Sequence, residues 1–268
     1  MKICMMSLML GDKPIEEIVS IAQACKMEAI DWIGLHNHTA AELKKVCDDA
    51  GLPIVSHTMF KWGFVNDDPA YFDEFKASLD DACTLNAPIM MLPPFPRKNQ
   101  TSLADDRSRY LDYFGRAVEL AKKANVTLTL ESTGYGNSPI TTADECLELL
   151  NALPDLMVTF DQGNVATAED PIAAFAKLRD RVVHFHVKDW TVSNVNFSET
   201  SELKRCGRFF DSATIGYGDM DIAGFWKTTN ERERQLFVNP ETKDWSNTRP
   251  ALEVFQEVCR TMKSWEEE

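Results

Sequence analysis

Long apolar runs, paired cysteines and positive charge are all scarce in this sequence of 268 residues. No apolar run approaches the roughly 20 residues needed to cross a bilayer, so we expect no membrane partner. The first ten residues are followed at once by Gly11 and Pro14, so we expect no signal peptide. The seven cysteines are scattered and never stand in CxxC spacing, which is typical of reduced thiols in a cytoplasmic protein.

The shortage of positive charge excludes one class of partner. Only 28 Lys and Arg residues stand against 42 Asp and Glu residues, which gives a net charge of −14. A surface of this sign repels nucleic acid and acidic membranes. We therefore expect no nucleic-acid partner.

What the sequence does have is a regular alternation of short apolar runs with longer amphipathic segments. Thr39–Glu42 and Thr142–Glu145 fit the capping box, which marks the start of a helix. Eight such repeats favour a closed (β/α)8 TIM barrel, a single domain over residues 1–268. An open doubly wound sheet is the alternative, but no GxGxxG turn follows an early strand. The predicted strands are residues 2–8, 28–36, 52–58, 87–93, 126–132, 156–162, 182–188 and 234–239.

The last repeat needs a choice between strand and helix. The segment RPALEVFQEVCRTMKSW, residues 249–265, contains ALEVF, which resembles a strand. Its apolar residues recur every three or four positions, which indicates a helix: Leu252, Phe255, Cys259, Met262 and Trp265. The eighth strand is therefore RQLFVN, and it ends at Asn239.

Ionisable side chains gather where the predicted strands end. Glu131 ends the strand in LTLES, Asp161 follows an apolar run in TFDQGN, and His186 lies in VVHFHVK. The carboxyl ends of barrel strands meet on one face, and a buried carboxylate needs a compensating charge. Two carboxylates and one imidazole suit Mn²⁺, Mg²⁺, Co²⁺ or Zn²⁺. The alternative is a hydrogen-bonded core histidine and an aspartate that caps the next helix.

At these residues the chain resembles the xylose isomerase-like barrel superfamily, the sugar phosphate isomerase/epimerase group that also contains endonuclease-IV-type proteins. LTLES and TFDQGN resemble the fifth and sixth strands of that family, whose ligands correspond to Glu131 and Asp161. VVHFHVKD resembles its seventh strand, with His186 as ligand. IGYGDMDIAGF, residues 215–225, resembles its G-x-G-D turn before the seventh helix.

The chain departs from the family pattern at two positions. Asn164 stands where the family often has a histidine after the sixth-strand aspartate, and we expect it to bind substrate. In the eighth strand the family supplies a glutamate that is both ligand and base, but this sequence has Asn239, then Pro240 and Glu241. Either Asn239 coordinates the metal through its amide oxygen, or Glu241 reaches back to replace the missing glutamate.

The resemblance implies a metal-dependent isomerase or epimerase that removes a proton α to the carbonyl of a sugar, sugar phosphate or inosose. Glu131 is the expected base, with Glu241 as its partner. A dehydratase or β-eliminase on the same site is one alternative. Another is a non-catalytic sugar-binding subunit with a degraded metal site, which Asn239 suggests. The resemblance also admits a homo-oligomer. Endonuclease chemistry is not expected, because it would need a histidine-rich three-metal cluster and the chain has only five histidines.

Other side chains near strand ends are candidates for substrate binding. We expect Lys188 to donate hydrogen bonds to substrate oxygens, with a structural salt bridge as the alternative. We expect His57 to contact substrate, with a packing role as the alternative. Trp62 and Trp190 offer flat faces for a sugar ring, with loop or core packing as the alternative. We expect His184 to point deeper into the barrel, as a hydrogen-bonded core residue.

The long connection over residues 191–215 is predicted to be a lid or a disordered loop. It carries Lys204, Arg205 and Arg208 in an otherwise acidic chain. A basic lid could contact a phosphate or carboxylate of the substrate. The alternative is three ordinary cations on a solvated loop.

Overall fold

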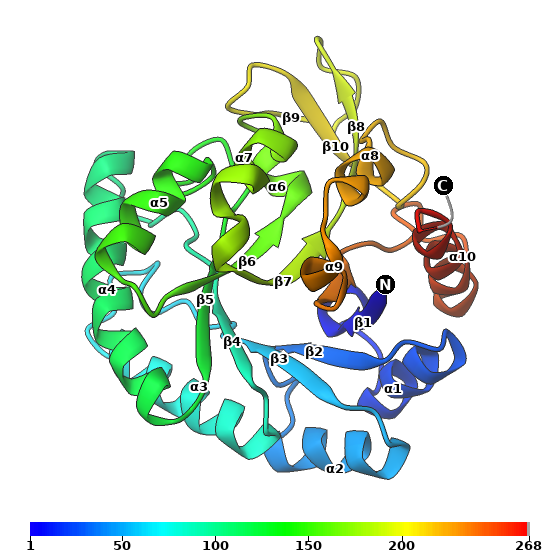
Figure 1. Cartoon of the computed structure of the whole chain (residues 1–268), viewed down its shortest axis with the longest axis horizontal. Coiled ribbons are helices and arrows are strands. Elements are labelled where there is room, and N and C mark those ends of the chain that lie inside the picture. Colours follow the sequence, from blue (N-terminus) through cyan, green and yellow to red (C-terminus); the bar gives the residue numbers. More distant parts are fainter. Residues whose placement is uncertain (267–268) are drawn as a thin grey trace.

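The computed structural model describes residues 1–266, and its centre is a closed barrel of eight parallel strands (Figure 1). Neighbouring strands run in the order β1-β11-β7-β6-β5-β4-β3-β2. The predicted (β/α)8 barrel is confirmed: seven strands lie inside their predicted ranges, and the eighth ends one residue beyond its range, at Pro240. The barrel strands are β1 (Lys2–Met6), β2 (Ala29–Ile33), β3 (Ile54–Thr58), β4 (Ile89–Leu92), β5 (Thr127–Glu131), β6 (Met157–Asp161), β7 (Val182–Val187) and β11 (Phe237–Pro240).

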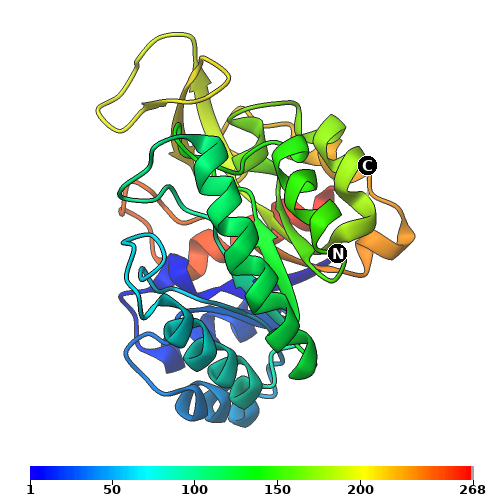
Figure 2. The same cartoon turned by 90° about the vertical axis from the view of Figure 1, so that its left-hand side faces the viewer.

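Helices surround the strands on the outside of the barrel (Figures 1 and 2). Both predicted capping boxes are present, at Thr39 and at Thr142. The C-terminal segment is helical as predicted, and it buries Phe255, Cys259 and Met262 of the predicted stripe but leaves Leu252 exposed. The α-helices are α1 (Ile15–Ala24), α2 (Ala40–Ala50), α3 (Tyr71–Leu85), α4 (Leu103–Lys123), α5 (Ala143–Ala152), α6 (Gln162–Ala166), α7 (Pro171–Leu178), α8 (Ile222–Lys227), α9 (Glu231–Arg234) and α10 (Ala251–Ser264); the 3-10 helices are η1 (Ser7–Leu10) and η2 (Arg179–Arg181).

Strand β7 shows how period-two alternation divides the core into two compartments. Phe185 points outward, where its ring packs near Phe160, Phe175 and Phe225 in the layer between sheet and helices. The alternate residues, including His186, point into the barrel and are buried there. The outward-facing apolar side chains of β7 therefore pack against the helices, and the inward-facing polar side chains are available to form a site.

The connection after β7 differs from its prediction. It forms a three-stranded antiparallel sheet in the order β8-β10-β9, made of β8 (Asp189–Ser193), β9 (Glu202–Leu203) and β10 (Phe209–Ala213). This sheet projects from the barrel and is yellow in Figures 1 and 2. Alternating residues such as Trp190 and Val192 give β8 the composition of a strand, so the segment is ordered by pairing with β10.

No helix within residues 1–266 is long and apolar enough to cross a membrane.

Candidate metal centre and active site

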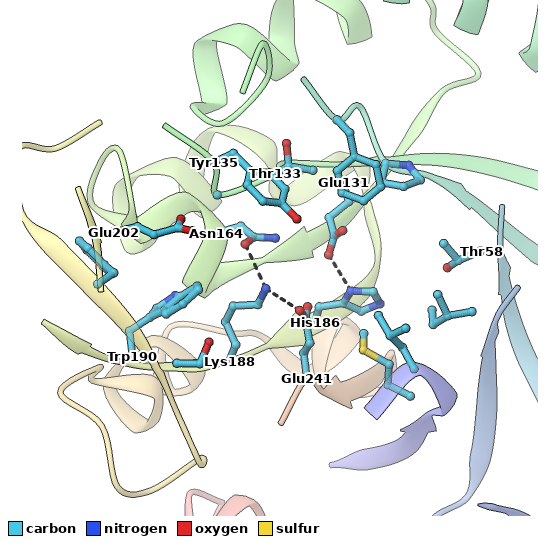
Figure 3. Close-up of a pocket in the computed structure, with 18 of the residues that line it drawn as sticks. Thr58, Glu131, Thr133, Tyr135, Asn164, His186, Lys188, Trp190, Glu202 and Glu241 are labelled. Atoms are coloured by element: carbon cyan, nitrogen blue, oxygen red, sulfur yellow. Dashed lines mark hydrogen bonds and ion pairs between the residues drawn. The ribbon is translucent and has the colours of Figure 1, made fainter. Parts of the chain in front are cut away.

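A cavity of about 360 Å³ opens at the carboxyl ends of the barrel strands, beside the β8-β10-β9 sheet (Figure 3). Its lining combines charged groups with many aromatic rings. The charged and polar lining residues are Thr58, Glu131, Thr133, Asn164, His186, Lys188, Asp189, Thr200, Glu202, Lys204, Asp211, Ser212 and Glu241; the aromatic ones are Phe60, Trp62, Phe95, Tyr135, Trp190, Phe210 and Trp245.

Four side chains from neighbouring strand ends converge at this cavity, and we call them the four-residue cluster: Glu131, Asp161, His186 and Glu241. One donor atom from each lies within 4.8 Å of the other three. Because β5, β6, β7 and β11 are successive neighbours in the barrel, their carboxyl ends bring these groups together. The structure thus joins the three predicted ligands and adds Glu241, which follows Pro240 at the end of β11.

Asp161 uses its two carboxylate oxygens differently. Oδ1 accepts a hydrogen bond of 2.9 Å from the backbone N–H of Asn164 and so caps helix α6. Oδ2 is buried and has no hydrogen-bond partner within the described chain. Burial, together with the charges of Glu241 and Glu131, raises the pKa of Asp161 to about 8, although Lys188 opposes the shift. The predicted cap and a ligand role are therefore compatible, since each uses its own oxygen.

Lys188 places its ammonium group among these carboxylates, as Figure 3 shows. Its Nζ lies 2.7 Å from Glu241 Oε1 and 3.4 Å from Asp161 Oδ2, and it donates to Asn164 Oδ1 at 3.1 Å. Burial alone would lower the pKa of Lys188, but Asp161, Glu241 and Glu131 outweigh it and hold the pKa above its ordinary value. Lys188 therefore remains charged, and the predicted salt-bridge alternative is present alongside its position in the cavity.

His186 links the four-residue cluster to deeper groups. Its Nδ1 lies 2.6 Å from Glu131 Oε1, whereas its Nε2 lies 3.4 Å from Asp31 Oδ2 and 3.1 Å from Asn239 Nδ2. Burial lowers the pKa of His186, but the charges of Glu131 and Asp31 outweigh it and raise the pKa well above its ordinary value. The ring is thus held with Nδ1 facing the cavity.

Beneath the cluster lies a sealed set of polar side chains that we call the inner layer: Cys4, Asp31, His184 and Asn239. Asn239 Nδ2 donates to Asp31 Oδ2 at 2.7 Å, and Cys4 Sγ donates to Asn239 Oδ1 at 2.6 Å. His184 is fully buried as predicted, and its Nε2 lies 3.5 Å from Asp31 Oδ2, but neither ring nitrogen has a hydrogen-bond partner within the described residues. The amide oxygen of Asn239 faces Cys4, so the geometry favours Glu241 over Asn239 as the fourth donor.

Asp31 is the residue that sequence analysis missed. It is fully buried in β2 within the apolar run AIDWI. Burial raises the pKa of Asp31, but the nearby imidazoles of His184 and His186 lower it by more. The net pKa is below its ordinary value, so the carboxylate is ionised. A charged residue inside an apolar strand was the available signal, but Asp31 stands in mid-strand, away from the strand ends where the other ionisable residues gather.

The other predicted contacts divide into two groups. Asn164, Trp62 and Trp190 line the cavity, and Trp190 Nε1 donates to Gly163 O at 2.9 Å. His57 is absent from the cavity lining, so the expected substrate contact is corrected in favour of the packing alternative: its Nδ1 lies 3.2 Å from Trp32 O and its Nε2 lies 3.1 Å from Ser78 Oγ. Period-two alternation explains this, because its neighbour Thr58 takes the inward position at the end of β3.

The basic residues of the 191–215 connection also have definite positions. Lys204 lines the cavity, with its Nζ 2.5 Å from Glu202 Oε2. Arg205 forms two hydrogen bonds of 2.8 Å to Glu145 at the start of α5. Of Lys204, Arg205 and Arg208, only Lys204 lines the cavity. The expected basic lid is therefore a single ammonium group, and it already pairs with Glu202.

The charges of this region fit a divalent cation. Four carboxylates meet here (Asp31, Glu131, Asp161 and Glu241), and the neighbouring cations are Lys188 and His186. With Asp161 ionised, as a ligand must be, four negative charges less two positive charges leave two uncompensated, and the Oδ2 atom of Asp161 lacks a hydrogen-bond partner. Carboxylate oxygens with one imidazole nitrogen form a donor set that Mn²⁺, Mg²⁺, Co²⁺ and Zn²⁺ accept. The residues therefore fit a metal, and Lys188 alone does not neutralise them.

The chain belongs to the family of xylose isomerase-like TIM barrels, whose model matches residues 19–265. This confirms the family resemblance of the strand-end motifs. A comparison with curated proteins found no match.

Solved structures share the whole fold at low sequence identity. The probable 3-DHS dehydratase AsbF from Bacillus anthracis is 18% identical, with 98% of this chain and 99% of that chain covered and a TM-score of 0.75. The apo form of the 3-keto-D-glucoside 4-epimerase YcjR from E. coli is 14% identical, with coverages of 98% and 99% and a TM-score of 0.75. The IOLI protein with a bound zinc atom is 15% identical, with coverages of 99% and 98% and a TM-score of 0.76. These similarities establish the fold alone.

Proposed function

We propose that this protein is a divalent-metal-dependent isomerase or epimerase of a keto-sugar or related polyol, acting by proton abstraction α to a carbonyl. The observation that carries the proposal is the four-residue cluster, whose donor atoms lie within 4.8 Å of one another beside a cavity rich in aromatic side chains. Family membership supports the same class, as do the epimerase and the dehydratase that share the fold.

Glu131, Asp161, His186 and Glu241 would hold the metal. A divalent ion at this position supplies a Lewis acid for the substrate carbonyl and for the negative oxygen that forms when the α proton leaves. The zinc atom in the IOLI protein supports a divalent ion in this fold, and the oxygen-rich donor set here also suits Mn²⁺ or Mg²⁺.

Two carboxylates are available for proton transfer. Glu131 lines the cavity and is the proposed base. Glu241 also lines the cavity and can return a proton from a second position, which an amide at Asn239 could not do. A pair of carboxylates permits epimerisation at one carbon or isomerisation between neighbouring carbons.

Lys188 favours these reactions over elimination. Dehydration on the same site is the alternative, and it requires an acid that protonates the leaving hydroxyl. Asp161, Glu241 and Glu131 raise the pKa of Lys188 despite its burial, so its ammonium group holds its proton firmly. Lys188 is better suited to donate hydrogen bonds to substrate oxygens as negative charge develops there.

The decisive test is proton exchange in D₂O, followed by NMR, with the metal-supplemented protein and a panel of keto-sugars and inososes. Deuterium incorporation at a carbon α to a carbonyl is expected, with an isomer or epimer as product. An unsaturated product would support the dehydratase alternative. Absence of exchange with the whole panel would contradict the proposed proton abstraction.

Metal content separates an enzyme from a sugar-binding subunit with a degraded site. Chelator-stripped protein should take up about one equivalent of Mn²⁺ or Zn²⁺, measured by elemental analysis after desalting. Uptake below about half an equivalent would favour the non-catalytic alternative.

A further inference from the structure

The cavity has a zone that the proposed proton transfer does not use. Four aromatic side chains on the loops after β3, β4 and β5 form a continuous series, which we call the aromatic row: Phe60, Trp62, Phe95 and Tyr135. Successive ring centroids are 5.2, 5.2 and 5.9 Å apart, and the planes of Trp62 and Phe95 are stacked at 28°. All four residues line the same cavity as Glu131.

The aromatic row remains open to solvent. Phe60 is 38% exposed, Trp62 is 44% exposed and Tyr135 is 48% exposed. Side chains that pack only to stabilise a fold are usually covered, and adjoining exposed rings at a cavity mark a binding surface. Trp245, which is 40% exposed, lines the same cavity from the segment after β11.

Polar groups from the β8-β10-β9 sheet face these rings. The Nζ of Lys204 lies 5.8 Å from the ring centroid of Tyr135 and 5.8 Å from that of Trp190. Glu202 pairs with Lys204, and Figure 3 shows Glu202 and Trp190 on the side of Lys188 away from His186. The two hydrogen bonds between Arg205 and Glu145 fix this edge of the sheet to the barrel.

We propose that this zone is a second subsite, which binds a further ring joined to the reacting sugar. The substrate class is then a glycoside or disaccharide rather than a free monosaccharide. Flat aromatic faces bind the apolar face of a ring, and the carboxylate and ammonium groups opposite bind hydroxyls, so the surroundings suit a ring better than an alkyl chain. The volume of about 360 Å³ lies within the ~300–1,000 Å³ range of small-molecule pockets, so the aromatic row rather than the volume indicates the second ring.

The second subsite rests on the proposed function, so its test must distinguish failure of the subsite from failure of the proposed function. Binding of methyl β-D-glucoside, phenyl β-D-glucoside and cellobiose to the metal-loaded protein would be measured by calorimetry. These probes share one glucosyl ring and differ in what is attached to it. Phenyl glucoside or cellobiose should bind about tenfold more tightly than methyl glucoside, a difference of ~1.4 kcal/mol.

Variants locate the preference within the cavity. Trp62→Ala and, separately, Tyr135→Ala should reduce the ratio of two-ring to one-ring affinity to near one. The matched control is Tyr217→Ala, which removes an exposed tyrosine that is absent from the cavity lining and should leave the ratio unchanged.

Each result has a defined meaning. Equal affinity for all three probes, no detectable binding of any probe, or loss of the ratio in the control would overturn the second subsite. Exchange of monosaccharide protons in D₂O without a two-ring preference would leave the proposed function intact while refuting this inference. A two-ring preference without exchange on any keto-sugar would support the second subsite and contradict the proposed proton abstraction.

Discussion

The four-residue cluster and the inner layer are both polar, yet they have different surroundings and suit different tasks. Glu131, His186 and Glu241 line the cavity, where a substrate can reach them. The inner-layer residues Asp31 and Asn239 are sealed inside the barrel. Polar side chains of similar chemistry can therefore contact substrate in the four-residue cluster and orient other side chains in the inner layer.

His186 connects the two levels through its two ring nitrogens. Nδ1 faces Glu131 and the cavity, whereas Nε2 faces Asp31 and Asn239. Metal-binding histidines commonly pair the second nitrogen with a carboxylate, which fixes the ring and makes the first nitrogen a better ligand. Asp31 stands in that relation to His186, so we expect cluster variants to change the reaction and inner-layer variants to change metal affinity or stability.

The largest effect should follow Glu131→Gln, which keeps the shape of the side chain but removes the base. The rate of α-proton exchange in D₂O should fall by about 10²–10⁴-fold. Glu148→Gln is the matched control, because Glu148 is a solvent-exposed glutamate of α5 that pairs with Arg107. If Glu131→Gln exchanged protons at the parent rate, Glu131 would not be the base.

The next largest effect should follow Asp31→Asn. The amide cannot replace the charged acceptor beside His186 Nε2, so metal affinity should fall by about 10–100-fold. A competition titration with a coloured chelator measures this, and the visible spectrum of the Co²⁺-loaded variant reports whether the ligand geometry has changed.

Asp106→Asn controls for loss of a buried aspartate, since Asp106 is fully buried on α4 and pairs with Arg97. Equal losses of metal affinity in the two variants would show that general destabilisation, rather than the contact with His186, explains the result.

The contrast between the two levels also marks how far sequence alone could predict this protein. Periodicity located all eight barrel strands and α10, because burial of one face forces a regular spacing of apolar residues. Strand-end positions brought Glu131, Asp161 and His186 together, since the carboxyl ends of parallel strands share one face. Both inferences use local pattern and a general property of the barrel.

The remaining features depend on contacts between distant segments. Asp31 meets Asn239 across 208 positions of sequence, and no local pattern specifies that pair. The inward or outward direction of His57 depends on the register of β3. Whether residues 189–213 form a sheet depends on pairing between β8 and β10.

A smaller effect concerns the pH dependence of the metal-free protein. The pKa of Asp161 is raised to about 8 by burial, Glu241 and Glu131, so the folded protein binds a proton that the unfolded chain has lost. The free energy of unfolding should therefore fall as pH rises toward 8, by up to about 1.4 kcal/mol per pH unit. The raised pKa of His186 acts in the same direction above pH 6.5. His57 acts in the opposite direction only below pH 6.5, since burial lowers its pKa to about 4.

Urea unfolding between pH 6.5 and 8 in the presence of a chelator measures this decline. Added Mn²⁺ should abolish it, because a metal ion replaces the proton as the compensating charge. Asp161→Asn should make the decline of the metal-free profile less steep, leaving the contribution of His186. A metal-free stability that rose over this range would show that Asp161 is ionised without a metal.

The smallest effect should follow Cys4→Ala, which tests the boundary between the two levels. Cys4 Sγ donates to Asn239 Oδ1, so its removal leaves a buried amide oxygen without a donor, at a cost of about 1 kcal/mol in the free energy of unfolding. Cys4→Ser retains a donor and serves as the control. Metal affinity should change by less than about threefold, because the influence of Cys4 on His186 passes through Asn239 alone. A loss of metal affinity as large as that of Asp31→Asn would mean that the whole inner layer, rather than Asp31, sets the position of His186.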